Sequence, residues 1–197
     1  MSGDQTYRIF IAIELPAAVR QGIKQHIDRL RRTFPEVRAS WSREDNLHLT
    51  LKFLGDVLIS QTPALSEACA KAARQSVPFE LVVEGGGMFP PRGRPKVLWV
   101  GVSSGLEATQ QPLLKLRESV EDACAAAGFA PEPRPYHPHL TIARLRESKD
   151  ARALAEQHRQ IGFLPEAYMV SEIVLFRSEL SSKAAQHTPL SRHQFGS

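Results

Sequence analysis

The chain has 197 residues, of which 42% are hydrophobic and 23% are charged, the proportions of an ordinary globular protein. This composition excludes a disordered or fibrous chain, and no apolar run reaches the roughly 18 residues that a bilayer-spanning helix needs. The 25 basic and 21 acidic residues leave a net charge of +4, which permits an anionic partner such as RNA without requiring one.

The first half of the chain predicts two strands and two helices. Residues 7–15 alternate and are rich in β-branched side chains, which indicates a strand. A helix with one apolar stripe follows over residues 16–34 and begins at a proline, which the first helical turn tolerates. Residues 46–54 alternate cleanly and predict a second strand that ends at Gly55, before a second helix over residues 63–75.

The second half of the chain predicts more strands than helices. The segment from Gly85 to Pro95 is rich in glycine and proline and is expected to be a loop, with a turn or bulge at its first glycines. The predicted helices cover residues 106–127 and 150–160, and the predicted strands cover residues 79–84, 96–102, 139–145, 168–178 and 186–191. Few connections are strand–helix–strand crossovers, so the pattern favours an α+β fold with largely antiparallel sheets.

One four-residue motif occurs twice. His48-Leu49-Thr50-Leu51 recurs as His139-Leu140-Thr141-Ile142, and both copies lie in predicted strands. Because residues i and i+2 of a strand point to the same face, each copy presents an imidazole beside a hydroxyl. Phe53 is expected on the opposite face, packed with the leucines. If two duplicated halves face each other across a pseudo-twofold axis, both imidazoles and both hydroxyls converge on one cleft.

These residue types suit the hydrolysis of a phosphodiester. Histidine titrates at about pH 6.5, so a neutral imidazole can activate water while a charged one protonates the leaving oxygen. Two hydroxyl groups are good donors for the non-bridging oxygens of a phosphate. This chemistry requires no metal ion, and we expect no cofactor.

The motif pair resembles that of the 2H phosphoesterase superfamily, and within it the chain is similar to the RNA 2′,3′-cyclic phosphodiesterases, historically called 2′-5′ RNA ligases. The resemblance runs from Arg8-Ile9-Phe10-Ile11-Ala12-Ile13 to Thr188-Pro189-Leu190 and includes the segments Asn46 to Gly55 and Tyr136 to Arg144. It implies a single bilobal α+β domain over residues 1–197, with two pseudo-twofold-related, largely antiparallel sheets, helices on the outer faces and a central cleft.

The reaction that the resemblance implies opens a 2′,3′-cyclic phosphate, at an RNA end or in a small cyclic nucleotide, to a 2′-phosphate. In this reaction His48 looks like the proton donor to the leaving 3′ oxygen, and His139 looks like the base that activates water. Thr50 and Thr141 would hold the phosphate, and Arg144 is similar to a family residue that contacts it. Arg144 lies five residues after His139, so it reaches the same face only if the strand bulges or the side chain turns round the strand end.

Several aromatic residues are candidates for base recognition or support. Phe10, Phe53 and Tyr136 could stack a terminal base, and the two phenylalanines could instead pack in the core. His137 is interpreted as a local support residue. The pair His137 and His139 could also bind a metal, but no acidic residue follows at a useful spacing, so we predict no metal site.

The remaining assignments are less specific. Arg92, Arg94 and Lys96 are expected to be solvated loop charges, or RNA contacts if their loop borders the cleft. Cys69 and Cys124 lack metal-ligand spacing and are expected to be small buried hydrophobes. The histidines in helix or tail contexts are expected at the surface, at positions His26, His158, His187 and His193. No signal-peptide pattern opens the sequence, so we expect a cytoplasmic protein, a monomer without a membrane partner.

Three functions remain open at this point. The first is hydrolysis of a cyclic phosphate. The second joins a cyclic phosphate end to a 5′-hydroxyl end as a 2′-5′ linkage, which is the reverse chemistry on the same site. The third is an RNA-binding module without catalysis, which the paired histidines and threonines argue against, because binding alone needs Lys and Arg more than imidazoles.

Overall fold

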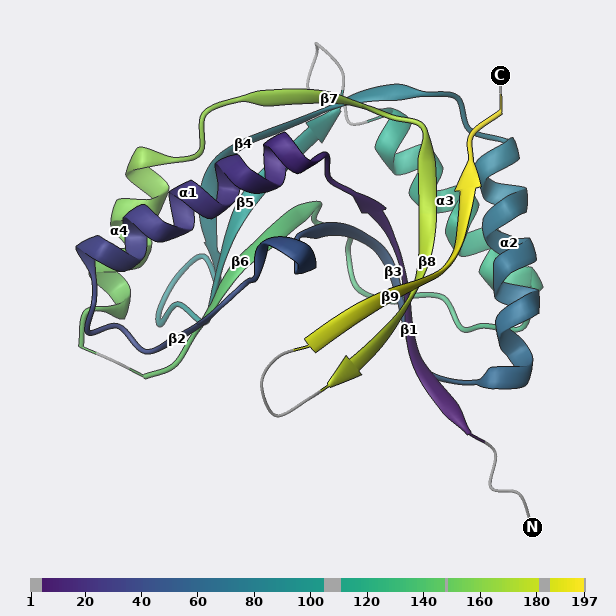
Figure 1. Ribbon diagram of the computed structural model, residues 1–197, viewed down its shortest axis with the longest axis horizontal. Coiled ribbons are helices and arrows are strands. Elements are labelled where there is room, and N and C mark those ends of the chain that lie inside the picture. The colour runs from purple at the N-terminus through teal and green to yellow at the C-terminus, as the bar shows by residue number, and fades with distance from the viewer. Residues whose placement is uncertain (1–4, 105–110, 148, 181–184, 197) are drawn as a thin grey trace.

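A computed structural model describes residues 5–104, 111–147, 149–180 and 185–196, which form two sheets and four α-helices (Figure 1). Sheet A has the strand order β3 (His48–Leu58), β1 (Thr6–Glu14), β8 (Glu172–Leu180) and β9 (Ala185–Gln194). Sheet B has the order β2 (Ala39–Trp41), β6 (His139–Leu145), β5 (Val97–Ser104), β4 (Phe79–Phe89) and β7 (Glu166–Val170). The helices are α1 (Ala17–Thr33), α2 (Thr62–Arg74), α3 (Gln111–Ala126) and α4 (Ala151–Ile161).

All neighbouring strands of both sheets pair antiparallel, which confirms the predicted α+β class. With the strands β2, β7 and β9 set aside, the two halves of the chain repeat one order of strands and α-helices, β1-α1-β3-α2-β4 and then β5-α3-β6-α4-β8. In the first repeat the two leading strands lie in sheet A and the last lies in sheet B; in the second repeat the sheets are exchanged. This exchange relates the two lobes by a pseudo-twofold axis and makes β3 the counterpart of β6.

The helices cover the outer faces of the two lobes (Figure 1). On one side α2 and α3 pack against each other and on sheet A, and on the other side α4 lies on β4 with α1 beside it. Most buried side chains from both sheets and from the helices form one large core, which includes Ile11, Ile23, Leu65, Leu140 and Leu154, and a smaller cluster in sheet A includes Phe10. Both cysteines are free and buried, as expected.

Most predicted elements are confirmed, and the differences occur where tertiary pairing overrides the local pattern. β3 does not end at Gly55 but continues to Leu58, because Gly55 adopts a φ of +73° and still pairs with Ile9. The predicted strand over residues 168–178 is broken at Ser171, where the chain passes from sheet B to sheet A. The short edge strand β2 was not predicted. Of the expected loop, the glycines belong to β4 and form its predicted bulge.

The prediction that His26 and His158 lie at the surface is wrong. Their side chains are 6% and 0% exposed. The His158 Nε2–H donates to the carbonyl of Trp99 at 2.9 Å, which leaves Nδ1 to accept from His26 Nε2 at 3.0 Å. This chain of hydrogen bonds ties α1 and α4 to β5. Within the part of the chain that is described, no helix is long and apolar enough to cross a membrane.

Candidate active site

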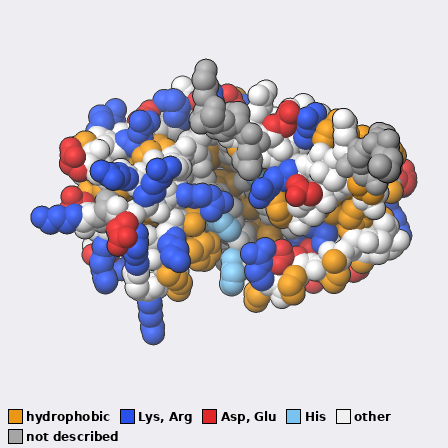
Figure 2. Space-filling model, turned by 90° about the horizontal axis from the view of Figure 1, so that it is seen from below, with side chains coloured by type: hydrophobic (Ala, Val, Ile, Leu, Met, Phe, Trp, Pro, Cys, Tyr) orange, Lys and Arg blue, Asp and Glu red, His pale blue; other side chains and the backbone are white. Residues whose placement is uncertain are grey.

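The two copies of the motif lie in one cleft between the lobes. His48 is the first residue of β3 and His139 is the first residue of β6. Both histidines line a cleft of about 1040 Å³ together with Thr50 and Thr141. Figure 2 shows the hollow from below, with histidine side chains on its wall. The predicted shared face of each His-x-Thr motif therefore corresponds to the cleft wall.

The two imidazoles are held in the same way. His48 Nδ1 lies 2.9 Å from the carbonyl oxygen of Asn46, and His139 Nδ1 lies 2.6 Å from that of His137. A carbonyl only accepts, so each Nδ1 carries a proton and donates it. Each Nε2 is then free of hydrogen in the neutral ring and becomes a donor in the charged ring. Each lobe thus provides one nitrogen able to accept or donate a proton.

The His48 ring lies between aromatic neighbours that remove it from water. Phe10 stacks on it with 4.6 Å between ring centroids, and His187 meets it edge-on at 5.2 Å. Burial and, to a lesser extent, the neighbouring His187 lower the pKa of His48 to about 4, although the bond to the Asn46 carbonyl opposes this shift. Phe10 is only 3% exposed, so its ring mainly packs against the histidine and leaves little surface for a ligand.

His139 has a matching aromatic surrounding in sheet B. Phe89 meets its ring edge-on at 5.1 Å, and Trp99 lies 6.4 Å away. Burial lowers the pKa of His139, and the hydrogen bond to the His137 carbonyl opposes this shift. The place of Trp99 depends on Gly87, because a Cβ added there would lie 2.1 Å from the indole ring. The glycine bulge of β4 therefore makes room for the ring beside His139.

Two bulges at equivalent positions bring a further pair of side chains into the cleft. Leu51 has no partner in β1, and Ile142 has no partner in β5. Each bulge lies three residues after its histidine and reverses the alternation beyond it. Arg144 consequently reaches the cleft on the same side as His139, and Phe53 occupies the equivalent position in β3.

The two bulges explain how Arg144 reaches the cleft and correct the expected position of Phe53. Of the two routes considered for Arg144, the bulge is the one that the structure has. The expectation that Phe53 packs opposite the motif is wrong, since its side chain is 43% exposed and lines the cleft. The guanidinium carbon of Arg8 lies 4.9 Å from the centroid of the Phe53 ring, a cation–π contact.

Hydroxyl groups brace the two motifs across the cleft. The Tyr136 hydroxyl donates to the carbonyl of Thr50 at 3.1 Å, and the Ser42 hydroxyl donates to the carbonyl of Thr141 at 2.7 Å. Each donor comes from the segment that leads into the other motif. The Tyr136 hydroxyl is thus bonded to the backbone of the other motif; Arg117 lies over the Tyr136 ring at 5.2 Å, and burial raises the pKa of the hydroxyl.

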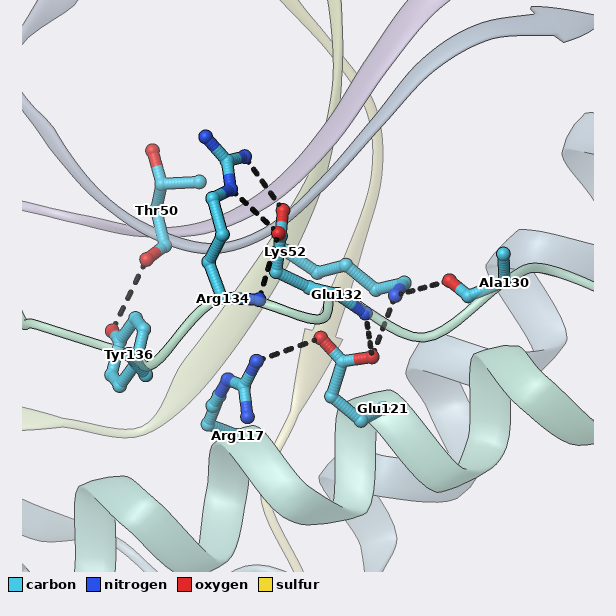
Figure 3. A network of polar contacts seen from close by, with 8 residues as sticks. All are labelled: Thr50, Lys52, Arg117, Glu121, Ala130, Glu132, Arg134 and Tyr136. Atoms are coloured by element: carbon cyan, nitrogen blue, oxygen red, sulfur yellow. Dashed lines mark hydrogen bonds and ion pairs between the residues drawn. The ribbon is translucent and has the colours of Figure 1, made fainter.

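A buried ion pair anchors the segment that precedes β6 (Figure 3). Lys52 Nζ lies 2.6 Å from the Glu121 carboxylate of α3 and donates to the carbonyl of Ala130 at 2.9 Å. Glu121 also accepts from Arg117 and from the backbone N–H of Glu132. Because β3, α3 and residues 130–132 meet at this carboxylate, the network positions the segment that carries Tyr136.

Some of the remaining candidate residues line the cleft and others do not. His137 is exposed at the cleft, and its carbonyl supports His139. None of Arg92, Arg94 and Lys96 lines the cleft among the residues described, and Arg94 pairs with Glu147 at 3.1 Å. His187 does line the cleft, against the expectation of a surface residue. In the sequence, His187 directly precedes the Thr-Pro-Leu segment that the family resemblance includes, and this position was the available indication of a place in the cleft.

No three His, Cys, Asp or Glu side chains are grouped to hold a metal ion among the described residues. The electrostatics of the cleft favour neutral imidazoles, since burial lowers the pKa of both histidines. A bound anionic phosphate stabilises the charged form of a nearby imidazole and so raises its pKa.

The pH dependence of a reaction that uses both histidines follows from these shifts. Both pKa values lie below the usual 6.5, so the bell-shaped profile of kcat/KM, which reports the free enzyme, is expected to peak below about pH 6.5. The profile of kcat, which reports the complex with the phosphate, is expected to peak at higher pH. Steady-state kinetics between about pH 4 and 9 check both curves. A flat kcat/KM profile, or one that peaks above pH 7, would contradict the two-imidazole scheme.

Comparisons with known proteins agree on one family. The 2′-5′ RNA ligase superfamily matches residues 19–181. An RNA 2′,3′-cyclic phosphodiesterase of Geobacillus stearothermophilus is 34% identical over 91% of this chain, which spans about half (54%) of that relative. One of Methanothermobacter thermautotrophicus is 30% identical over 93% of this chain and 96% of its own length. The crystal structure of Escherichia coli LigT complexed with 3′-AMP has a TM-score of 0.74 and 28% identity, covering 97% of this chain and 99% of that one.

Proposed function

The chain belongs to the 2′-5′ RNA ligase superfamily, and from this membership we propose that it hydrolyses terminal 2′,3′-cyclic phosphates of RNA to 2′-phosphates, without a metal ion. The observation that carries the proposal is the equivalent pair His48 and His139, which both line one cleft and both bond through Nδ1 to a backbone carbonyl, so that each has Nε2 left for proton transfer. Relatives named RNA 2′,3′-cyclic phosphodiesterase support the choice of substrate.

The proposed reaction is an in-line displacement at phosphorus. Neutral His139 accepts a proton at Nε2 from a water molecule, and the oxygen of that water forms a bond to phosphorus. The bond from phosphorus to the 3′ oxygen breaks, and charged His48 donates the proton of its Nε2–H to this leaving oxygen. The 2′ ester bond stays intact, so the product is a 2′-phosphate, and each histidine ends with the charge that the other had.

The phosphate needs fixed donors while its charge is redistributed. We assign this role to the hydroxyls of Thr50 and Thr141, which lie on the cleft wall beside the histidines. Arg144 adds a permanent positive charge in the same cleft. The tyrosine and serine braces hold the backbone of both threonines, which keeps the donors in place before the substrate binds.

We assign Phe53 to the terminal base, because its exposed ring lies in the cleft at the position equivalent to Arg144. Stacking of a base on an aromatic ring contributes about 1–3 kcal/mol. Phe53→Ala is therefore expected to raise KM for a cyclic mononucleotide about tenfold with kcat nearly unchanged, and Phe53→Trp is expected to retain the affinity. Ribose 2′,3′-cyclic phosphate, which has no base, should show no difference among the three proteins. A loss of kcat in Phe53→Ala on both substrates would overturn the assignment.

Turnover of a 2′,3′-cyclic mononucleotide in EDTA tests the proposed function. We expect hydrolysis at the same rate with and without the chelator. Loss of activity in EDTA that added divalent metal restores would contradict the metal-free mechanism. The same assay with an added 5′-hydroxyl oligonucleotide detects 2′-5′ joining, and dominant joining would favour the ligase alternative.

A further inference from the structure

A second hollow, which we call the arginine groove, lies beside the cleft. It has a volume of about 820 Å³ and lies between the end of α1 and the ends of β2 and β6. Its basic lining residues are Arg31, Arg32, Arg38 and Arg146. Its one acidic lining residue among those described is Asp28, which Lys24 Nζ approaches to 2.6 Å. The groove therefore carries a clear excess of positive charge.

The charges of the groove are largely uncompensated. Arg32, Arg38 and Arg146 are exposed, and none of them forms an ion pair within the described part of the chain. Some arginines elsewhere in the described residues, such as Arg29 and Arg159, also lack an ion pair, but others pair with a carboxylate, at positions Arg74, Arg94, Arg117, Arg134, Arg152, Arg177 and Arg192. Glu147 follows Arg146 directly but pairs with Arg94. Positive charge without a protein partner, grouped in one hollow, is typical of a phosphate-binding surface.

The groove is continuous with the cleft. Trp41 of the edge strand β2 lines both hollows. β2 pairs with β6 so that Ser40 faces Arg144, and the N–H of Arg146 donates to the carbonyl of Arg38. Arg144 in the cleft and Arg146 in the groove are thus two residues apart on one strand end. Figure 2 shows Lys and Arg side chains crowded over the half of the molecule that holds β2 and the end of α1 in Figure 1.

We propose that the arginine groove binds the phosphates of the RNA strand that precedes the cyclic end, so that the preferred substrate is an oligonucleotide and not a mononucleotide. This inference rests on the proposed function for the identity of the end bound in the cleft. With the terminal phosphate near Arg144, the strand passes over Trp41, which offers a stacking surface, and places its backbone along Arg38, Arg146 and Arg32. The contacts are to phosphates, so they carry no base preference.

The test compares two triple variants with equal loss of charge. In the groove variant, Arg32→Gln, Arg38→Gln and Arg146→Gln are combined. In the control variant, Lys71→Gln, Lys115→Gln and Arg159→Gln are combined; these residues are exposed on three helices, line neither hollow and form no ion pair among the residues described. Two substrates are used, a 2′,3′-cyclic mononucleotide and a single-stranded RNA of about ten nucleotides with the same end. Binding of that RNA in its 2′-phosphate form is measured by fluorescence anisotropy at several salt concentrations.

Each phosphate contact contributes about −0.7 to the slope of log K against log salt for single strands, so the groove variant should flatten this slope by about 2. Its KM for the oligonucleotide should rise about tenfold or more at low salt, while its kinetics on the mononucleotide stay within about twofold of the unmodified protein. The control variant should match the unmodified protein on both substrates.

Three results would overturn the proposal that the arginine groove binds RNA. They are unchanged RNA binding in the groove variant, equal losses in the two variants, and equal losses on both substrates. If RNA binding is unchanged in the groove variant, an acidic protein becomes the partner to test for the groove. Absence of turnover in the unmodified protein would count against the proposed function, and the anisotropy measurement would still decide whether the groove binds RNA.

Discussion

Replacement of either cleft histidine, His48→Ala or His139→Ala, is expected to lower kcat for a 2′,3′-cyclic phosphate by about 10²- to 10⁴-fold. This is the usual contribution of a positioned general acid or base. The two Nε2 atoms serve the same chemical step, since one accepts a proton from water while the other donates a proton to the 3′ oxygen. The double variant should therefore be little slower than either single variant. Single-turnover kinetics measure the chemical step in each case.

The control for this series is His193→Ala. His193 lies on β9, within 3.4 Å of Ser66 and outside the cleft lining. Its removal should change kcat by less than about twofold. If His48→Ala and His139→Ala behave like this control while remaining folded, the histidines are not the acid and base. If their losses simply multiply in the double variant, they act independently and the shared proton scheme is wrong.

Glu121→Leu is expected to lower the free energy of unfolding by about 3–5 kcal/mol, because it leaves the charge of Lys52 buried without its carboxylate. Lys52 is 3% exposed and, among the residues that the structure describes, retains the Ala130 carbonyl as its one hydrogen-bond partner. The variant also releases the anchor of the segment that leads to Tyr136, so activity should fall as well. Urea denaturation measures the stability.

Two further variants separate the ion pair from simple damage to α3. Glu118 is exposed one turn earlier on the same helix, and Glu118→Leu should change stability by less than about 0.5 kcal/mol. The double variant Lys52→Met and Glu121→Leu removes both charges and should recover most of the loss. Equal destabilisation by Glu118→Leu and Glu121→Leu would show that the buried pair has no special role.

The fold class and the two motifs could be predicted from the sequence because their signals are local. Alternation in residues 46–54 and 139–145 reports which side chains share a face, and the repeat of His-x-Thr reports the duplication. The bulges that follow each motif could not be read in this way. An unpaired residue is a property of the register between two strands, so Leu51 and Ile142 look like ordinary members of an alternating run.

Other features depend on segments that are far apart in the chain. His26 and His158 each look like a polar residue on a helix, and their burial depends on hydrogen bonds to each other and to the Trp99 carbonyl. His187 meets the ring of His48 although β9 and β3 lie at opposite edges of the same sheet, and Phe10 of β1 contacts both rings. β2 is too short to carry a pattern of its own, and it is identified by its pairing with β6.

The isomer released from adenosine 2′,3′-cyclic phosphate in EDTA tests the two-histidine cleft most directly. Chromatography separates the 2′- and 3′-phosphates of the product. The mechanism predicts the 2′-phosphate alone, because His48 protonates the 3′ oxygen as its bond to phosphorus breaks. Release of the 3′-phosphate, or no reaction with either this substrate or an RNA that ends in a cyclic phosphate, would contradict it.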